Sequence, residues 1–525
     1  MDPRTLVMLL ALAGSQLHAQ DFVLDPSFGT NGVAYQPGPE PYSGASPLVM
    51  ETLPDGGFLS LHSAGVDAIK VMRCTPNGKP DSSFAINGHF ILAPPSIGLI
   101  PSGMVVRPDG KIIITATGLF QGTNDPKIFI CQLLPNGVPD PSFGVDGVLY
   151  YNMPVYQILR DAVLQTDGKI LVAGGSSGSM FVSRFLPNGD LDLSFATNGI
   201  GLYNPPGVTA SAKTIALGPD GSIYVGGFKS IGADASAWVV AKAAPNGVLD
   251  PSFGDGGIFF LDHVPDQSTM SNKPECIMDL MVLDDGSLIA GGYVALSDTW
   301  ERLAIMKLDA FGQAVHEFGD NGRIYAGTLP EGRYLGKELV YDPTGLFILV
   351  GSMLTLDNRK EVVILAFDGM GTVLDQNGSN APFQFQPEVQ MQLTTCGTFD
   401  LQGRLIVAVS HWNQPEGRSS FIAFNFDINV GSNEFPENSI GLSAWPNPTS
   451  GQLSISYDLQ AASKVSVDLL DVSGRTVERS LTNAHRSSGA QLEHLSLDPS
   501  LSSGTYHLRV RTGAGSWTRT VVIDR

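Results

Sequence analysis

The histidines are the first candidates for acid–base or metal chemistry, because imidazole titrates near neutral pH and binds zinc. Within residues 20–430 they stand alone, at His62, His89, His263, His316 and His411, without an HExxH motif or a paired zinc spacing. The segment 174–178 (GGSSG) is interpreted as a flexible loop between strands rather than as a nucleophile elbow. No glycine motif for a dinucleotide or a phosphate is present. These residues therefore give no positive sign of an enzyme.

Aspartate occurs in a pattern that argues against catalysis, because a catalytic residue is normally singular. One aspartate recurs in the phrase Asp-Pro-Ser-Phe-Gly and its variants, at Asp25, Asp81, Asp140, Asp192 and Asp250. An aspartate in such a phrase usually caps a turn by accepting backbone amides. Calcium in oxygen-rich loops is the alternative, although no copy has the spacing of a calcium-binding EF-hand loop. The sequence therefore predicts no cofactor and leaves calcium open.

Composition narrows the fold and the partners. The chain has 525 residues, a net charge of −20, 60 glycines and 35 prolines. That much glycine and proline argues against long helices, because both destabilise the helical hydrogen-bond ladder. The acidic charge argues against nucleic-acid binding, which needs a basic surface.

The N-terminus predicts export. A short head with Arg4 precedes the apolar run 6–14 and a polar tail that ends in Ala19, which is the order of a signal peptide over residues 1–19. No later apolar run is long enough for a membrane span. The four cysteines lie far apart without a CxxC pair, so they are interpreted as buried free thiols: Cys74, Cys131, Cys276 and Cys396.

An internal repeat dominates residues 20–430. The Phe phrase recurs around Phe28, Phe84, Phe143, Phe195, Phe253 and Phe318. A second phrase follows in step: two apolar runs around a turn such as Pro-Asp-Gly, then a third apolar run, which is often followed by Pro-Asn-Gly. Each repeat thus predicts four short strands, which is typical of a propeller blade.

Counting the strands predicts how the repeats close. Seven strand pairs precede seven third strands, whereas the strand 32–36 stands alone at the N-terminus and the last repeat lacks its fourth strand. We therefore expect an all-β fold, a seven-bladed β-propeller closed by this N-terminal strand beside residues 421–426. An open β-solenoid is the alternative.

The two phrases resemble the delta-60 repeat family, and the best copy lies within residues 162–199. The sixth and seventh copies depart from the pattern, since residues 315–317 replace Asp-Pro-Ser and the last copy lacks the Phe. This resemblance implies a repeat scaffold and no chemistry.

A polar linker, residues 431–442, leads to a C-terminal segment of alternating strands, residues 443–525. Its motifs WPNPTSGQLSI, VDLLDVSGRTV and GTYHLRV resemble the type A sorting domain of the type IX secretion system of the Bacteroidetes lineage. The resemblance implies a secreted or outer-membrane surface protein that binds the type IX translocon and a surface sortase. We expect a small immunoglobulin-like β-sandwich, with the sorting signal at Pro446, Asn447, Pro448, Gly451, Gly474, Gly504 and Tyr506.

Function is expected on the more varied face of the propeller, because varied loops on a rigid scaffold usually carry recognition. Trp300 and Trp412 are the best anchors for a glycan or protein ligand. The other candidates on this face are Tyr42, Tyr156, Arg333, Tyr334, His62 and His411. The sequence favours a non-catalytic binding or adhesion protein. The alternative is a secreted propeller enzyme of the lyase or lactonase type, with or without a metal, that acts on extracellular polymers or lactones. Its candidate residues are Asp125, Asp234, His62 and His411.

Overall fold

The computed structural model describes most of the chain between residues 22 and 523. The described ranges are 22–36, 45–64, 67–120, 122, 126–152, 157–204, 208–231, 235–262, 274–297, 300–327, 332–342, 346–357, 359–374, 381–386, 396–411, 419–426, 442–459, 462–470, 476–499, 501–512 and 515–523. The predicted signal peptide and most of the predicted linker lie outside these ranges. Throughout the described ranges the elements are strands joined by turns, with no helix, so the predicted all-β class is confirmed. Accordingly, the described residues contain no helix that would span a membrane.

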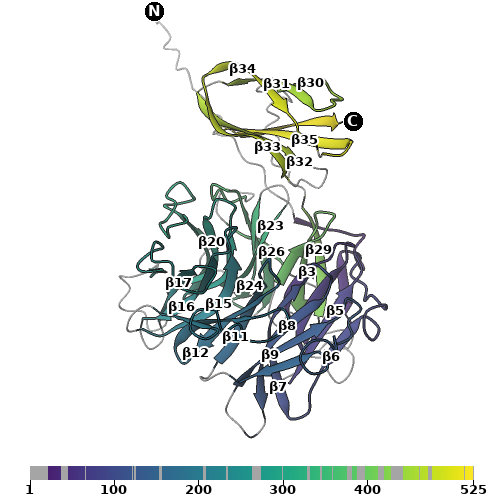
Figure 1. Ribbon diagram of the computed structural model, residues 1–525, viewed down its shortest axis with the longest axis vertical. Helices are drawn as coiled ribbons and strands as arrows, with labels where there is room; N and C mark the ends of the chain where they lie inside the picture. Colours follow the sequence, from purple (N-terminus) through teal and green to yellow (C-terminus); the bar gives the residue numbers. More distant parts are fainter. Residues whose placement is uncertain are drawn as a thin grey trace, which may run out of the picture. The chain divides into compact units, whose positions relative to one another are not determined.

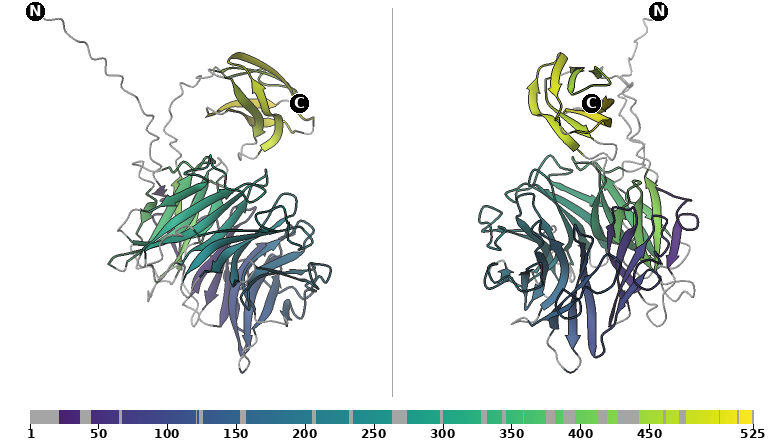
Figure 2. Two further views of the ribbon diagram at one scale, coloured as in Figure 1. Left: turned by 90° about the vertical axis from the view of Figure 1, so that its left-hand side faces the viewer. Right: turned by 45° about the vertical axis from the view of Figure 1, so that its right-hand side comes forward.

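The chain divides into two compact units, Asp21–Asp427 and a second unit that contains Ile428–Arg525. The first unit is coloured purple to green in Figures 1 and 2, and the C-terminal strands are yellow.

In the first unit, the strands form sheets of four in chain order, and neighbours within a sheet pair antiparallel. The first three sheets are β3 (Ala45–Thr52), β4 (Phe58–Ala64), β5 (Ala68–Cys74), β6 (His89–Leu92); β7 (Ile97–Val106), β8 (Ile112–Phe120), β9 (Pro126–Leu133), β10 (Val148–Tyr151); and β11 (Gln157–Leu164), β12 (Ile170–Ser176), β13 (Ser179–Phe185), β14 (Ile200–Tyr203). The next three are β15 (Ala210–Leu217), β16 (Ile223–Ser230), β17 (Ser236–Ala243), β18 (Ile258–Leu261); β19 (Cys276–Val282), β20 (Leu288–Ser297), β21 (Trp300–Leu308), β22 (Arg323–Ala326); and β23 (Gly332–Tyr341), β24 (Phe347–Thr355), β25 (Lys360–Phe367), β26 (Phe383–Phe385).

The last sheet of this unit takes its outer strands from the N-terminus. Its first three strands are β27 (Cys396–Phe399), β28 (Leu405–Ser410) and β29 (Ser419–Phe426). The strand β2 (Val33–Gln36) pairs with β29, with Ala34 opposite Phe421, so the predicted closing strand is confirmed. An additional short strand, β1 (Phe22–Leu24), pairs with the other half of β29. The sequence analysis did not predict β1.

The first strands of successive sheets lie side by side around a common centre. They follow one another in the order β3, β7, β11, β15, β19, β23 and β27, and β27 lies against β3 again. An open solenoid would leave β27 and β3 at opposite ends of the unit, so that alternative is wrong. All four cysteines are free and buried, as predicted.

The repeated phrases join neighbouring sheets. Each Phe of the phrase is buried, and its ring packs on the glycine turn of the next sheet. At Gly247, for example, φ is +85° and an added Cβ would lie 2.5 Å from the Phe195 ring, so only glycine fits. Beside this contact the Ala196 amide donates to the Asn246 carbonyl at 2.7 Å. Burial of each aromatic ring favours folding by about 2–3 kcal/mol.

The repeated aspartates cap the same turns, as the sequence predicted. In each copy one carboxylate oxygen accepts the backbone amide and the hydroxyl of the serine two residues later, as Asp192 does from Ser194 at 3.1 and 2.5 Å. The second carboxylate oxygen often pairs with an arginine or lysine side chain that also donates a hydrogen bond to the next sheet. Arg184 bonds Asp192 at 2.9 Å and donates to the Pro245 carbonyl at 2.6 Å.

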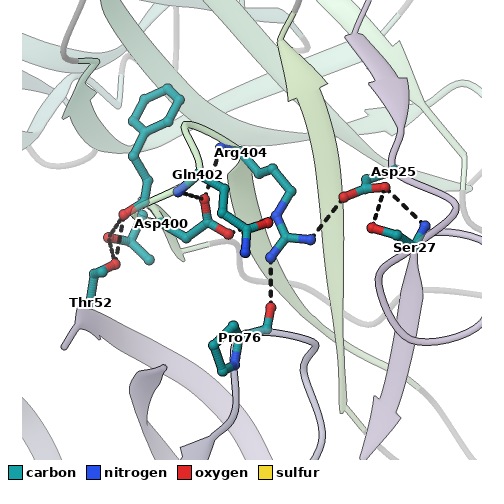
Figure 3. Close-up of polar contacts among 9 residues, drawn as sticks. Asp25, Ser27, Thr52, Pro76, Asp400, Gln402 and Arg404 are labelled. Atoms are coloured by element: carbon teal, nitrogen blue, oxygen red, sulfur yellow. Dashed lines mark hydrogen bonds and ion pairs between the residues drawn. The ribbon is translucent and has the colours of Figure 1, made fainter. Parts of the chain in front are cut away.

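The ring closes through a buried version of this bridge (Figure 3). Arg404 pairs with Asp25 at 2.8 Å and with Asp400 at 2.7 Å, and it donates to the Pro76 carbonyl at 2.6 Å. One guanidinium thus joins the N-terminal segment, the last sheet and the first sheet. Burial opposes ionisation of Asp25, but hydrogen bonds from Arg404 and Ser27 hold its pKa below the ordinary value.

The second unit has two sheets around one apolar core. The sheets are β31 (Gln452–Leu459) between β30 (Ser443–Trp445) and β34 (Gly489–Ser496), and the row β33 (Thr476–Arg486), β32 (Ser463–Leu470), β35 (Gly504–Thr512) and β36 (Gly515–Ile523). Ile455, Val467 and Leu508 are fully buried in the shared core.

We predict that Arg404→Met weakens the first unit by about 3–5 kcal/mol, because Asp25 and Asp400 would remain buried without their cation. Thermal and urea unfolding of the mature chain measures this loss. The control is Arg359→Met, since Arg359 pairs with Asp357 on the surface, where both side chains are at least half exposed. That change is expected to cost at most about 1 kcal/mol. Equal losses in the two variants would contradict a closing role for Arg404.

Candidate functional site

Several predicted binding residues lie outside the described residues: Tyr42, Tyr156, Trp412, and the enzyme candidates Asp125 and Asp234. Trp300 begins the strand β21, and its side chain is not among the described ones. These residues stay predictions.

His62, His411 and Tyr334 are buried, so the expectation that they are exposed on a loop is wrong. His62 lies within β4 and shares a hydrogen bond of 2.8 Å with the Ser60 hydroxyl, whereas His411 follows β28 and bonds the Ser420 hydroxyl at 2.7 Å. Burial lowers the pKa of His411 to about 4 and holds that of His62 well below its ordinary value. A serine–histidine pair suits a nucleophile and its base, but both pairs lie inside the packed sheets.

Arg333 is the binding candidate that is exposed. It lies in β23, not in a loop, and both guanidinium ends bind the carboxylate of the buried Glu301 in β21. The pair joins two neighbouring sheets. Arg333 is therefore already paired with Glu301, although 47% of its side chain remains exposed.

The predicted sorting residues cluster around the C-terminal strand β36. Pro446, Asn447 and Pro448 are exposed, the Asn447 side chain accepts the Val522 amide at 2.7 Å, and the Thr449 amide donates to the Val522 carbonyl at 2.8 Å. Of the remaining candidates, Gly504 and the buried Tyr506 lie in β35 opposite Ile523 and Val521 of β36, Gly451 bonds Thr449, and Gly474 lies outside the described residues.

A cavity of about 690 Å³ lies at the centre of the first unit. Its walls are the first strands of six sheets, β3, β7, β11, β15, β19 and β23. This volume is within the range of ligand pockets, roughly 300–1,000 Å³. It is the common centre of the ring of sheets.

Four carboxylates from different sheets line the cavity: Glu51, Asp161, Asp279 and Glu338. Asp161, Asp279 and Glu338 each follow a β-bulge in their strand. A bulge redirects side chains and often occurs near functional sites.

Three of these carboxylates bind backbone amides of the next sheet. Asp161 accepts the Ile215 amide at 2.9 Å, and Asp279 accepts the Leu339 amide at 2.8 Å. Glu338 accepts the Gly397 amide at 2.7 Å. These contacts fasten the inner edges of neighbouring sheets.

Burial raises the pKa of all four carboxyl groups, because a low-dielectric site penalises their charge. It raises the pKa of Glu51 to about 7, of Asp161 to about 7 and of Asp279 to about 6. The pKa of Glu338 lies well above its ordinary value, since burial is reinforced by the charges of Asp279, Glu51 and Asp161. The cavity thus holds carboxyl groups that titrate near neutral pH.

Three cations line the same cavity, and each occupies the bulge itself: Arg160, Lys213 and Lys337. In the part of the chain that the structure describes, none of the three forms an ion pair or a hydrogen bond with a protein side chain. Burial lowers the pKa of both lysines, and the neighbouring positive charges lower it further.

The sequence analysis missed these charged residues. They stand inside apolar runs such as QILRDAVL, at positions that no repeated phrase marks. The one available signal was that a carboxylate recurs at the same place in the first strand of three repeats, at Asp161, Asp279 and Glu338. No group of three or more histidine, cysteine or carboxylate residues with the geometry for a metal ion is present among the described residues.

We predict that Glu51→Gln increases stability more at pH 8 than at pH 5. A carboxyl group whose pKa is raised on folding stabilises the protein when protonated, and this contribution is lost as pH rises through the folded pKa of about 7. The expected gain at pH 8 is about 1–3 kcal/mol in urea unfolding. The exposed Glu317→Gln serves as control and should not alter the pH profile. Parallel profiles for wild type and Glu51→Gln would refute the prediction.

Two family models match the chain. Residues 443–524 match the family described as a secretion system C-terminal sorting domain. Residues 107–143, 165–195 and 218–253 match a domain of unknown function (DUF5122) described as a β-propeller. The search of curated proteins finds no match for the chain.

Solved structures give weak similarities. A protein of unknown function from Dyadobacter fermentans is 11% identical, with a TM-score of 0.40 over 63% of this chain and 100% of that one. Prolyl oligopeptidase B from Galerina marginata is 11% identical, with a TM-score of 0.40 over 80% of this chain and 57% of that one. The endo-arabinase from Bacteroides thetaiotaomicron is 11% identical, with a TM-score of 0.31 over 63% of this chain and 95% of that one. At such low TM-scores these likenesses carry no argument.

The two family matches agree with the sheets around a common centre and with the separate C-terminal unit. The sorting domain indicates a protein that is secreted or attached to the outer membrane and that interacts with the type IX secretion machinery. The chain is a β-propeller repeat protein with a type IX C-terminal sorting domain.

Proposed function

We propose that this protein is a non-catalytic binding or adhesion protein of the cell surface, built on a seven-bladed propeller. In this proposal residues 1–19 are a signal peptide, 20–430 the propeller, 431–442 a linker, and 443–525 an immunoglobulin-like sorting sandwich. The closing pairs of β2 with β29 and of β27 with β3 support a ring of seven blades.

The observation that carries the binding proposal is the engagement of the carboxylates in the central cavity. Asp161, Asp279 and Glu338 accept backbone amides from neighbouring sheets. A carboxylate in that role is a fixed structural acceptor, whereas a general base must be free to take a proton from the substrate. The cavity therefore favours holding a ligand over transforming it.

On the varied face, Trp300 and Trp412 remain the proposed anchors, and Tyr42 and Tyr156 remain further candidates. An exposed indole stacks well on a sugar ring or a peptide. Arg333 adds an exposed cation on the same proposed face.

A glycan and protein-ligand screen of the mature chain, with and without calcium, tests the proposal. We expect at least one ligand to bind, and we expect Trp300→Ala and Trp412→Ala each to weaken binding about tenfold, which corresponds to about 1.4 kcal/mol. Trp445→Ala in the sorting unit is the matched control and should leave affinity unchanged. Binding that neither anchor substitution affects would refute the two anchors.

One observation favours the alternative, a secreted lyase or lactonase. Carboxyl groups with pKa values of about 6 and 7 converge in the cavity, which suits acid–base chemistry at neutral pH. The same screen therefore includes product analysis. Turnover that Asp161→Asn or Asp279→Asn abolishes would establish an enzyme in place of a binding protein, and loss of turnover on chelation would add a metal.

We also predict that deleting residues 443–525 traps the remaining chain in the periplasm, because the sorting domain is the part that the type IX machinery recognises. Cell fractionation and surface proteolysis measure the distribution. The first unit is compact by itself, so the truncated chain should keep its unfolding transition. Normal surface delivery of the truncated, folded chain would contradict the prediction.

A further inference from the structure

A second cavity lies beside the central one, between the sheets of β11–β14 and β15–β18. Its volume is about 360 Å³. Arg160 lines both cavities, so the two openings share one guanidinium. The remaining lining of the smaller cavity includes Ser176, Ser177, Thr209 and Ser211 and the ring of Phe228.

The position of the smaller cavity follows from the blade geometry. Its walls are formed by the start of β11, the end of β12 with the turn that follows it, the start of β15 and the end of β16, so it belongs to the varied face. The segment 174–178, which the sequence analysis interpreted as a flexible loop, contributes the end of β12 and a tight turn. Its serines face the cavity from a defined backbone.

The two cavities together offer three kinds of contact. Hydroxyl groups line one side, and they both donate and accept hydrogen bonds. The Phe228 ring supplies an apolar face, and the Lys213 ammonium lies 5.6 Å from the centre of that ring. Arg160, Lys213 and Lys337 supply positive charge, and among the described residues no carboxylate lies within ion-pair distance of them.

A carboxylated saccharide matches all three contacts. Its hydroxyl groups suit the serine and threonine side chains, its ring suits Phe228, and its carboxylate suits the cations, since guanidinium binds carboxylate with two parallel hydrogen bonds. A bare small anion would leave the hydroxyls and the ring unused. A neutral sugar would leave the cations unused.

The four carboxyl groups of the central cavity do not contradict an anionic ligand. Asp161, Asp279 and Glu338 are turned toward backbone amides, and no ion pair joins any of the four to the three cations in the described part of the chain. The raised pKa values further reduce their negative charge near neutral pH.

We infer that the paired cavities around Arg160 bind the carboxylated sugar of an acidic glycan. This inference rests on the proposed binding function and names its ligand class.

Calorimetric titration of the mature chain tests the inference, with trigalacturonate as the probe and its fully methyl-esterified form as the neutral match. We expect trigalacturonate to bind at least tenfold more tightly than the ester, and we expect Arg160→Gln and Lys213→Gln each to weaken it at least fivefold. Arg160→Lys should restore part of the affinity. Lys79→Gln, on an exposed turn at the other end of its sheet, is the matched control and should bind like wild type.

Three results would overturn the inference. The first is equal affinity for the acid and the ester, and the second is wild-type affinity in folded Arg160→Gln. The third is that citrate, or a peptide with a free carboxyl terminus, binds at Arg160 as tightly as trigalacturonate does. Thermal unfolding of each variant separates lost binding from lost folding. If the screen above finds a ligand while trigalacturonate fails, the inference falls and the binding function stands. If trigalacturonate binds and is cleaved, the proposed site is supported and the proposal of a non-catalytic function is contradicted.

Discussion

The insertion of one aromatic ring per repeat over the glycine turn of the next sheet is the contact on which the first unit depends. A single four-stranded sheet cannot bury its apolar faces and needs a neighbouring sheet to cover them. Each Phe, from Phe28 to Phe318, ties its own sheet to the following one. Since Phe28 comes from the N-terminal segment and packs on Gly78 of the first sheet, the same contact also closes the ring.

The inner and outer rims of the ring are fastened by different chemistry. Toward the outside, repeated aspartates and cations bridge the turns, with Arg404 as the most buried case. Toward the centre, the carboxylates Asp161, Asp279 and Glu338 bind backbone amides of the next sheet. Desolvation makes such inner carboxylates costly to ionise, whereas the outer aspartates keep low pKa values through their serine and cation partners. Ionisation of the central carboxyl groups therefore changes both the stability of the unit and the charge that a ligand meets in the cavity. The aspartates of the outer turns are ionised and have little influence on either.

The sequence predicted well the features that follow from local, repeated phrases. It predicted poorly the features that depend on how the sheets pack. The strand class, the closing strand and the turn role of Asp25 follow from local patterns that recur, and recurrence makes each prediction stronger. The partner of Phe28 across the seam does not follow, because ring-to-turn contacts depend on how sheets pack. His62 was placed on a loop because the end of its strand is polar, although its cross-strand neighbours bury it. Asp161 and Arg160 escaped notice because a bulge, which the sequence does not mark, turns both toward the cavity.

The pairing of the N-terminal strand with the last sheet has a kinetic consequence. Asp25 and Arg404, which meet in the closed ring, are 379 residues apart in the chain. Loop closure over such a separation is slow, and contacts distant in sequence form late in folding. The first strands to leave the ribosome are then the last to find their place, so β29 keeps an open edge until the whole repeat region has been made.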